Sequence, residues 1–314
     1  MATTQQQVEE GVDTGQLGPG EKHRSLKADV WRQFRRHKGA LAGLVLLTVI
    51  VIATVFGPWL YPADPFEIDV ASANQTASVE HPMGTDNLGR DVLARILVGG
   101  RISLSVGFAA MIFGVILGVA IGVVSGFFRK LDGPLMRVTD LFLALPILPL
   151  LLVVIMLFRE PLKDAFGPEL GIFLLVVFII GVTSWMQTAR VVRGDVLAIK
   201  EQEFVLAAHS IGTRKRRVMT RHIVPNVLSP VMVAAALGVA VAILTESALS
   251  FLGLGFPADF PTWGRLLFDA KDYLQLNPMR VIWPGVMISL TVMSVNFIGD
   301  GIRDALDPKL RSKG

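Results

Sequence analysis

The chain of 314 residues is 52% hydrophobic, only 18% charged, and free of cysteine. Soluble domains carry about a quarter of their residues as charged side chains, so this composition argues against a soluble globular protein. The absence of cysteine excludes disulfides and thiolate chemistry and removes most structural zinc sites, and no metal site is predicted. The net charge of +4 requires no nucleic acid as a partner.

Six stretches contain no Asp, Glu, Lys or Arg and are long enough to cross a membrane. About 20 residues of helix cross a hydrocarbon layer of about 30 Å. Lipid offers the backbone no hydrogen-bond partner, and the runs lack the alternation of barrel strands, so each is predicted to be a helix. The predicted spans are 39–63, 102–128, 141–158, 170–189, 222–245 and 281–299. The fold class is therefore all-α, a polytopic membrane protein with six transmembrane helices.

The distribution of Lys and Arg predicts the orientation of these spans. The N-terminal tail, the C-terminal tail and the connections at 128–137 and 190–221 together carry 22 of these residues, and the alternate connections carry 8. By the positive-inside rule both termini face the cytoplasm. The connections at 61–101 and 255–280 then lie outside, where they are long enough to fold into small helices over the outer mouth.

The second span carries small residues at every fourth position. Ala110, Gly114, Gly118, Gly122 and Gly126 fall on one face of a helix and allow another backbone to approach closely. The ladder predicts a packing interface, either within the bundle or with a second subunit.

Two carboxylates within the predicted spans are candidates for the transport pathway, because ionisable groups in a membrane are usually functional. Asp140 lies about two turns into the third span, and Glu246 lies near the outer boundary of the fifth. Structural roles stay open for both: Asp140 can pair with Arg137 three residues earlier, and Glu246 can reach interfacial water. Pro146 and Pro149 are expected to bend the third span.

The polar segment EFVLAAHSIGTRKRRVMTRHIVPN, residues 203–226, lies between two apolar spans. Glu203 begins a predicted short helix, Ala207 and Ala208 give it a nearly bare face, and Gly212 can end it in the left-handed conformation. Such a helix can insert into a groove of a partner while arginines such as Arg214 contact the rim. Charge alone favours the other interpretation, a solvated basic loop that only fixes orientation.

The sequence contains no motif for ATP hydrolysis. No Lys follows a Gly, so the phosphate-binding G-x-x-x-x-G-K-[ST] loop is absent, and no H-E-x-x-H or G-x-S-x-G motif occurs. The chain is not expected to be an enzyme or to bind a cofactor. With few charges in the spans, transport powered by another protein is the favoured function.

The polar segment resembles the EAA loop of permease subunits of binding-protein-dependent ABC importers, through Ala207, Ala208, Gly212 and the H-I-V-P that ends at Pro225. Leu206 stands where the glutamate of that motif is expected, and His222 where an isoleucine is expected. Other stretches resemble the C-type permease of dipeptide and oligopeptide importers: HPMGTDNLGRDVLARILVGGRISLSVG (81–107), RHIVPN (221–226), ESALSFLGLG (246–255), PTWG (261–264) and IGDGIRDALDPKLR (298–311).

The resemblance implies a type I ABC importer permease fold in a bacterial cytoplasmic (inner) membrane. Residues 1–38 would be a partly disordered cytoplasmic tail, 39–100 the first span with an extracytoplasmic connection, and 101–310 a five-helix core with a coupling helix at about 201–213. Coupling to the ATPase would involve Glu203, Ala207, Ala208, Gly212, Arg214 and Pro225.

The implied partners are a second, homologous permease, two ABC ATPase subunits that bind ATP and Mg, an extracytoplasmic substrate-binding protein and the lipid bilayer. The implied cargo is a di- or oligopeptide. Glutathione, a nickel chelate, an opine or an oligosaccharide stays open within the same architecture. A self-contained secondary transporter or channel, or a membrane scaffold without transport activity, are the alternative classes.

Overall fold

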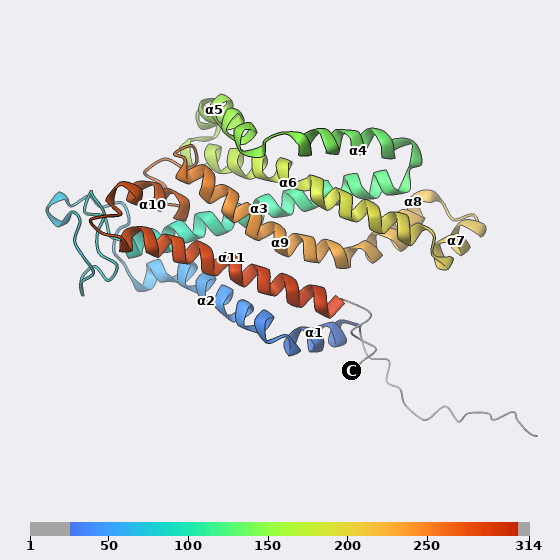
Figure 1. Ribbon diagram of the computed structural model, residues 1–314, viewed down its shortest axis with the longest axis horizontal. Helices are drawn as coiled ribbons and strands as arrows, with labels where there is room; N and C mark the ends of the chain where they lie inside the picture. The colour runs from blue at the N-terminus through green and yellow to red at the C-terminus, as the bar shows by residue number, and fades with distance from the viewer. Residues whose placement is uncertain (1–25, 307–314) are drawn as a thin grey trace, which may run out of the picture.

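The computed structural model describes residues 26–306, and its regular elements in this range are helices joined by turns and loops (Figure 1). Within the same range one isolated β-bridge joins Thr85 and Asp91. Most of the N-terminal tail, residues 1–25, and the last part of the predicted core, residues 307–310, lie outside the described residues.

The elements follow one another with short connections. In chain order they are α1 (Leu26–Arg36), α2 (Lys38–Leu60), the 3-10 turn η1 (Val70–Ser72), α3 (Val92–Phe127), α4 (Arg129–Ala144), α5 (Ile147–Phe166), α6 (Pro168–Lys200), α7 (Glu203–Ser210), α8 (Lys215–Val218), the π-helical turn η2 (Met219–Ile223), α9 (Val224–Phe251), α10 (Trp263–Ala270), the 3-10 turn η3 (Lys271–Tyr273) and α11 (Met279–Leu306).

Five helical segments of the described chain are long and apolar enough to cross a membrane: α2, α3, α6, the segment Lys215–Phe251 that ends in α9, and α11. The prediction of a membrane protein with several spans is therefore confirmed for these five segments by their length and composition. Most of the helices extend beyond the charge-free runs. The second span, for example, begins at residue 92, where Asp91 caps the first turn by accepting a hydrogen bond of 2.7 Å from Ala94 N–H.

The third predicted span is not one continuous helix, which corrects the expectation of a span over 141–158. The helix α4 ends at Ala144 and α5 begins at Ile147, with an angle of 88° between them. The sequence stays apolar through the break, but proline disfavours helical backbone in the residue before it, and Pro146 therefore stops α4. The pair counts as a sixth span only if its two helices are taken together.

The long helix α3 lies at the centre of the bundle. Its first turns pack with α2, α9, α10 and α11 through Ile96 and Leu104, its middle packs with α5 and α6 through Val106, and its last turns pack with α6 and α7 through Val123 and Phe127. One helix thus connects the two ends of the molecule, and Figure 1 shows α10 and the 61–91 connection at the end opposite to α7 and α8.

The last residues of the tail that is predicted to be partly disordered form the helix α1. The helix α1 buries Phe34 against Ala40 and Ala305, and a β-carbon at Gly301 would lie 3.1 Å from the Phe34 ring. The charged exposed face of α1 conceals this helix from a search for apolar runs.

Candidate functional site

The short helix α7 lies at the end of the bundle between α6 and α9 (Figure 1) and ends in a Schellman motif. Thr213 N–H donates to Ala208 O at 3.1 Å and Gly212 N–H donates to His209 O at 3.0 Å. Gly212 has a φ of +77°, which side chains with a β-carbon rarely adopt, and no atom lies within 4 Å of the position that its β-carbon would take. A substitution at Gly212 therefore strains the backbone without causing a clash.

The two faces of α7 differ in their neighbours. Val205 and Ala208 are buried and pack in one cluster with Val196, Val218 and Val227 of the bundle. This corrects the expectation that Ala208 contributes to a bare exposed face, because its small side chain is used against its own chain. The exposed side chains of this segment include Glu203 and Ala207 together with the large apolar groups Phe204, Leu206 and Ile211.

A basic hollow adjoins the end of α7. It has a volume of about 510 Å³ and is lined by Gly212, Thr213, Arg214, Arg216, Arg217 and Thr220. The π-helical turn η2 follows and continues into α9, where Pro225 lies exposed.

The glycine ladder of α3 faces α6 of the same chain. A β-carbon would lie 2.7 Å from Thr188 Cβ at Gly118, 2.7 Å from Ala189 O at Gly122, and 2.7 Å from Val196 Cβ at Gly126. At Gly114 it would overlap the hydroxyl oxygen of Ser184. All four glycines thus lie at one seam between two helices, where a side chain on α3 has no room.

Asp140 points toward α6 and forms an ion pair with Arg190, not with Arg137. Both side chains are about half exposed on the outside of the bundle. Eight residues earlier, Asp132 accepts a hydrogen bond of 2.7 Å from Arg193 Nη2. The two ion pairs attach α4 to α6. Apolar packing contributes little to the burial of α4, because Thr139 is its single buried residue.

Glu246 is fully buried, which corrects the expectation that it reaches interfacial water. Ser103 donates to its Oε2 at 3.1 Å and Ser250 donates to its Oε1 at 2.8 Å. Ser103 Oγ also accepts a hydrogen bond of 3.2 Å from Trp263 N–H. The carboxylate therefore joins α3, α9 and α10 at the end of the bundle opposite to α7.

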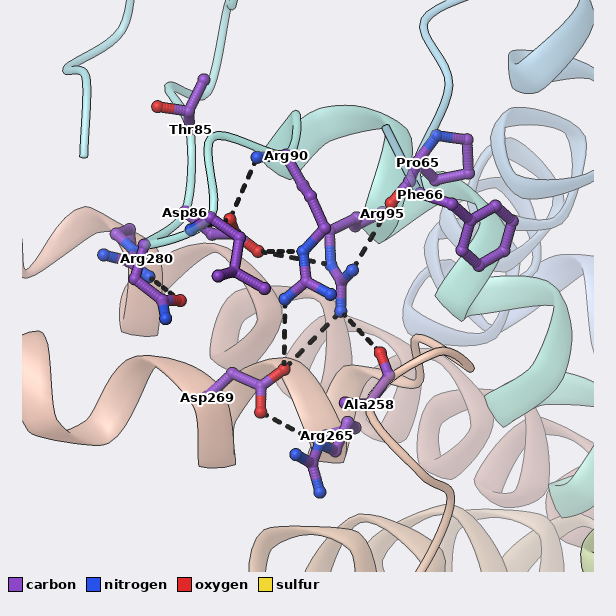
Figure 2. Close-up of polar contacts among 12 residues, drawn as sticks. Pro65, Phe66, Thr85, Asp86, Arg90, Arg95, Ala258, Arg265, Asp269 and Arg280 are labelled. Atoms are coloured by element: carbon purple, nitrogen blue, oxygen red, sulfur yellow. Dashed lines mark hydrogen bonds and ion pairs between the residues drawn. The ribbon is translucent and has the colours of Figure 1, made fainter. Parts of the chain in front are cut away.

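A second polar network at the same end was missed by the sequence reasoning (Figure 2). Asp86 accepts a hydrogen bond of 2.7 Å from Arg90 Nε, and Arg95 Nη2 lies 3.6 Å from Asp269 Oδ2. Arg265 Nε lies 2.9 Å from the other oxygen of Asp269. The network ties the loop that precedes α3 to α10.

Arg280 at the start of α11 extends this network to the 61–91 connection. Its Nη1 donates to Asn74 Oδ1 at 2.8 Å, and its guanidinium carbon lies 4.4 Å from the centre of the Tyr273 ring on η3. Arg95 donates to Pro65 O at 3.4 Å (Figure 2). Arg280 and Asn74, about 200 positions apart in the sequence, are therefore in contact. The one feature of the sequence that could have indicated this network is the pair Arg90 and Arg95 at the start of an apolar helix.

Among residues 26–306, no group of three or more His, Cys, Asp or Glu side chains is arranged to hold a metal ion.

Comparison with known proteins decides the family. Residues 110–312 match the family described as "Binding-protein-dependent transport system inner membrane component", and residues 25–77 match the "N-terminal TM domain of oligopeptide transport permease C". The chain belongs to the binding-protein-dependent permease family. It is a multi-pass membrane permease, and the predicted family resemblance is confirmed.

Curated members of this family are similar along almost the whole chain. The dipeptide transport system permease protein DppC of Alkalihalophilus pseudofirmus is 37% identical over 285 residues, 90% of each chain. The oligopeptide transport system permease protein OppC of Bacillus subtilis is 38% identical over 291 residues, 92% of each chain. OppC of Haemophilus influenzae is 39% identical over 309 residues, 98% of this chain and 94% of the relative.

The two family matches cover different parts of the permease. The N-terminal match covers α1, α2 and residues 61–77 of the following connection, and the C-terminal match runs from the middle of α3 to the C-terminal tail. The glycine ladder from Gly114 to Gly126, α7 and the basic hollow lie in the C-terminal match, while residues 78–109, which include Asp86, Arg90 and Arg95 of the polar network, fall between the two matches.

Proposed function

We propose that the protein is one of two permease subunits of an ATP-driven ABC importer for di- or oligopeptides in a bacterial cytoplasmic membrane. The observation that carries this proposal is the 37–39% identity, over at least 90% of the chain, to permeases named for dipeptide and oligopeptide transport. A homologous second permease would supply the other half of the pathway, and a substrate-binding protein would deliver the cargo from outside.

In this proposal α7 is the coupling helix, which an ATPase subunit contacts from the cytoplasm. The exposed side chains Phe204, Leu206, Ala207 and Ile211 would enter a groove of the ATPase, and the arginines of the basic hollow would contact its rim. ATP and Mg would be bound by the ATPases, since this chain has no phosphate-binding loop.

The packing of α7 suggests how movement would pass into the membrane. Val205 and Ala208 are buried against residues of α6 and α9, so a force on α7 would act on both long helices together. Through the glycine seam α6 would carry α3 with it, because the glycines of α3 pack directly against the backbone and side chains of α6. Such a block suits a rigid-body transition between outward-facing and inward-facing states.

The cargo is tested in a strain that lacks the gene and any parallel peptide importer. We expect loss of uptake of a labelled dipeptide or short oligopeptide, resistance to a toxic peptide, and restoration of both by the wild-type gene. Normal peptide uptake would contradict the cargo and direct the search to glutathione, nickel chelates, opines or oligosaccharides.

The importer class is tested by purification. We expect the protein to co-purify with a second permease and two ATPase subunits whose ATP hydrolysis responds to a loaded binding protein. Transport by the isolated chain in liposomes that contain no ATPase would instead indicate a secondary transporter.

A further inference from the structure

The buried polar network of Figure 2 carries more positive than negative charge. It brings together four arginines and two aspartates: Arg90, Arg95, Arg265, Arg280, Asp86 and Asp269. At most 15% of any side chain in its ion pairs is exposed, and 3% of Arg280 is exposed. Four positive charges against two negative ones leave an excess of two positive charges. Because an unbalanced charge is costly to bury, this excess indicates that an anion belongs to the network.

Two of the four arginines are balanced by an aspartate of their own. Arg90 Nε donates to Asp86 Oδ2 at 2.7 Å, and Arg265 Nε lies 2.9 Å from Asp269 Oδ1. Contacts of this length between a guanidinium and a carboxylate are close ion pairs. The excess positive charge therefore resides on the other two arginines.

Arg95 is fully buried, and its contacts with carboxylates are longer than hydrogen bonds. Its Nε lies 3.9 Å from Asp86 Oδ2, and its Nη2 lies 3.6 Å from Asp269 Oδ2. Its hydrogen bonds, each of 3.4 Å, go to the uncharged carbonyl oxygens of Pro65 and Ala258. Within the described part of the chain, Arg95 Nε has no hydrogen-bond partner, although the atom is buried. A buried donor without a partner is costly, which indicates that a further group accepts from this nitrogen.

Arg280 is the second arginine without a carboxylate of its own. Its Nη1 donates to Asn74 Oδ1 at 2.8 Å, and its Nη2 donates to Asn87 Oδ1 at 3.4 Å. Its guanidinium carbon lies 4.4 Å from the centre of the Tyr273 ring. These three partners are uncharged, so no ion pair within residues 26–306 balances the charge of Arg280.

Arg95 and Arg280 line the same cavity, which has a volume of about 20 Å³. Asp86 and Asp269 also line it, and the remaining lining residues are apolar: Val92, Leu266, Ala270 and Pro284. A cavity of this size holds a single particle about as large as a water molecule. A monatomic anion therefore fits, whereas phosphate or an organic carboxylate does not.

We propose that this cavity binds one chloride ion beside the guanidinium groups of Arg95 and Arg280. The ion accepts a hydrogen bond from Arg95 Nε and offsets one of the two excess positive charges. Asp86 and Asp269 do not exclude it, since each is already paired with a closer arginine. Arg95 lies near the start of α3 and Arg280 near the start of α11. The ion therefore links these two helices at the end of the molecule opposite to α7.

Other occupants fit the charge of the cavity less well. A water molecule can accept from Arg95 Nε, but it leaves the positive charge unbalanced, and a metal cation adds to that charge. Asp269 Oδ2 is also buried without a hydrogen bond. It lies 3.6 Å from Arg95 Nη2 and 4.0 Å from Arg90 Nη2, so two arginines balance the charge of this oxygen.

The test measures the unfolding temperature of the purified full-length protein, with any subunits that co-purify, at increasing chloride concentration. Sodium gluconate, whose anion is too large for the cavity, replaces NaCl so that the ionic strength stays constant. We expect chloride to raise the unfolding temperature along a saturable curve, by about 3 °C at about 0.15 M chloride for a dissociation constant of about 15 mM. Bromide is expected to replace chloride.

Two variants and one diffraction measurement locate the effect. Arg280→Gln removes one of the excess charges but can still donate to Asn74, and we expect it to abolish the difference between chloride and gluconate. Arg190→Gln removes an arginine that is about half exposed on the outside of the bundle, and it should retain the full difference. Crystals of the wild-type protein grown in NaBr, measured at the bromine absorption edge, should show an anomalous peak beside Arg95. This readout does not depend on the folding of a variant.

Equal unfolding temperatures of the wild-type protein in chloride and in gluconate would overturn the chloride site. A shift that grows in proportion to chloride without saturating would do the same, because it would be a general salt effect. Density in the cavity without a bromine signal would assign the cavity to water. A chloride effect that persists unchanged in Arg280→Gln would place the ion elsewhere and contradict the assignment to this cavity.

Discussion

Replacing Gly118 by alanine adds one methyl group between α3 and α6. The new β-carbon would lie 2.7 Å from Thr188 Cβ and 2.8 Å from Trp185 O, and a backbone oxygen cannot rotate away. The helices would have to separate by about 0.7 Å to restore ordinary van der Waals distances of about 3.5 Å. Overpacking of this kind costs about 1–3 kcal/mol, and the better helix propensity of alanine returns at most about 1 kcal/mol. We expect a net loss of about 1–2 kcal/mol.

Gly194 on α6 supplies the matched control for this substitution. It also lies inside a long helix, but no atom lies within 4 Å of the position of its β-carbon. Gly194→Ala is therefore expected to be neutral or to stabilise the helix by up to about 1 kcal/mol. Thermal unfolding of the purified proteins in one detergent measures both effects. If Gly118→Ala unfolds at the same temperature as Gly194→Ala, the ladder is not a close seam and the reasoning fails.

Three further predictions address topology, the buried carboxylate and the basic rim. A single cysteine at the exposed position Ala71 is expected to react with an impermeant thiol reagent added to spheroplasts, and one at the exposed position Ser210 is expected not to react. The opposite pattern would reverse the orientation. Glu246→Leu leaves the Ser103 hydroxyl without its acceptor and should lower the unfolding temperature through a loss of about 1–3 kcal/mol, whereas Glu246→Gln should lose less; equal unfolding temperatures would show that the network does not stabilise the fold. Arg214→Glu should reduce substrate-stimulated ATP hydrolysis only modestly, because exposed ion pairs contribute about 0–1 kcal/mol, and abolished stimulation would give this arginine a larger role.

The apolar runs of the sequence are sufficient to find most spans, because lipid requires the same property along the whole helix. Their limits are predicted less accurately. Arg95 and Arg101 belong to α3 although a charge-free window excludes them, since Arg95 is buried among carboxylates and Arg101 donates to Thr54 O at 2.7 Å. Composition also conceals the break between α4 and α5, where only the prolines signal a change in direction.

The interior partners of polar residues could not be predicted from one sequence. Counting residues places Glu246 near the outer boundary, but its burial depends on Ser103 and Trp263, which come from other helices. The network around Asp86 and Asp269 joins segments far apart in the chain.

For the segment around α7, the sequence predicts where the helix ends but not how the helix packs. The end of α7 at Gly212 was predictable, because positive φ is a local property of the backbone. The inward position of Ala208 was not, because it depends on how α7 packs against α6 and α9.

The most direct test of coupling through α7 is substrate-stimulated ATP hydrolysis by the reconstituted importer, compared between wild type, Gly212→Val and Gly212→Asn at equal membrane levels. A β-branched side chain at a φ of +77° is severely strained, whereas asparagine adopts this conformation more readily than most residues. We predict that Gly212→Val still pairs with the second permease but loses stimulation by peptide-loaded binding protein, and that Gly212→Asn retains most of it. Full stimulation in Gly212→Val would contradict coupling through this helix.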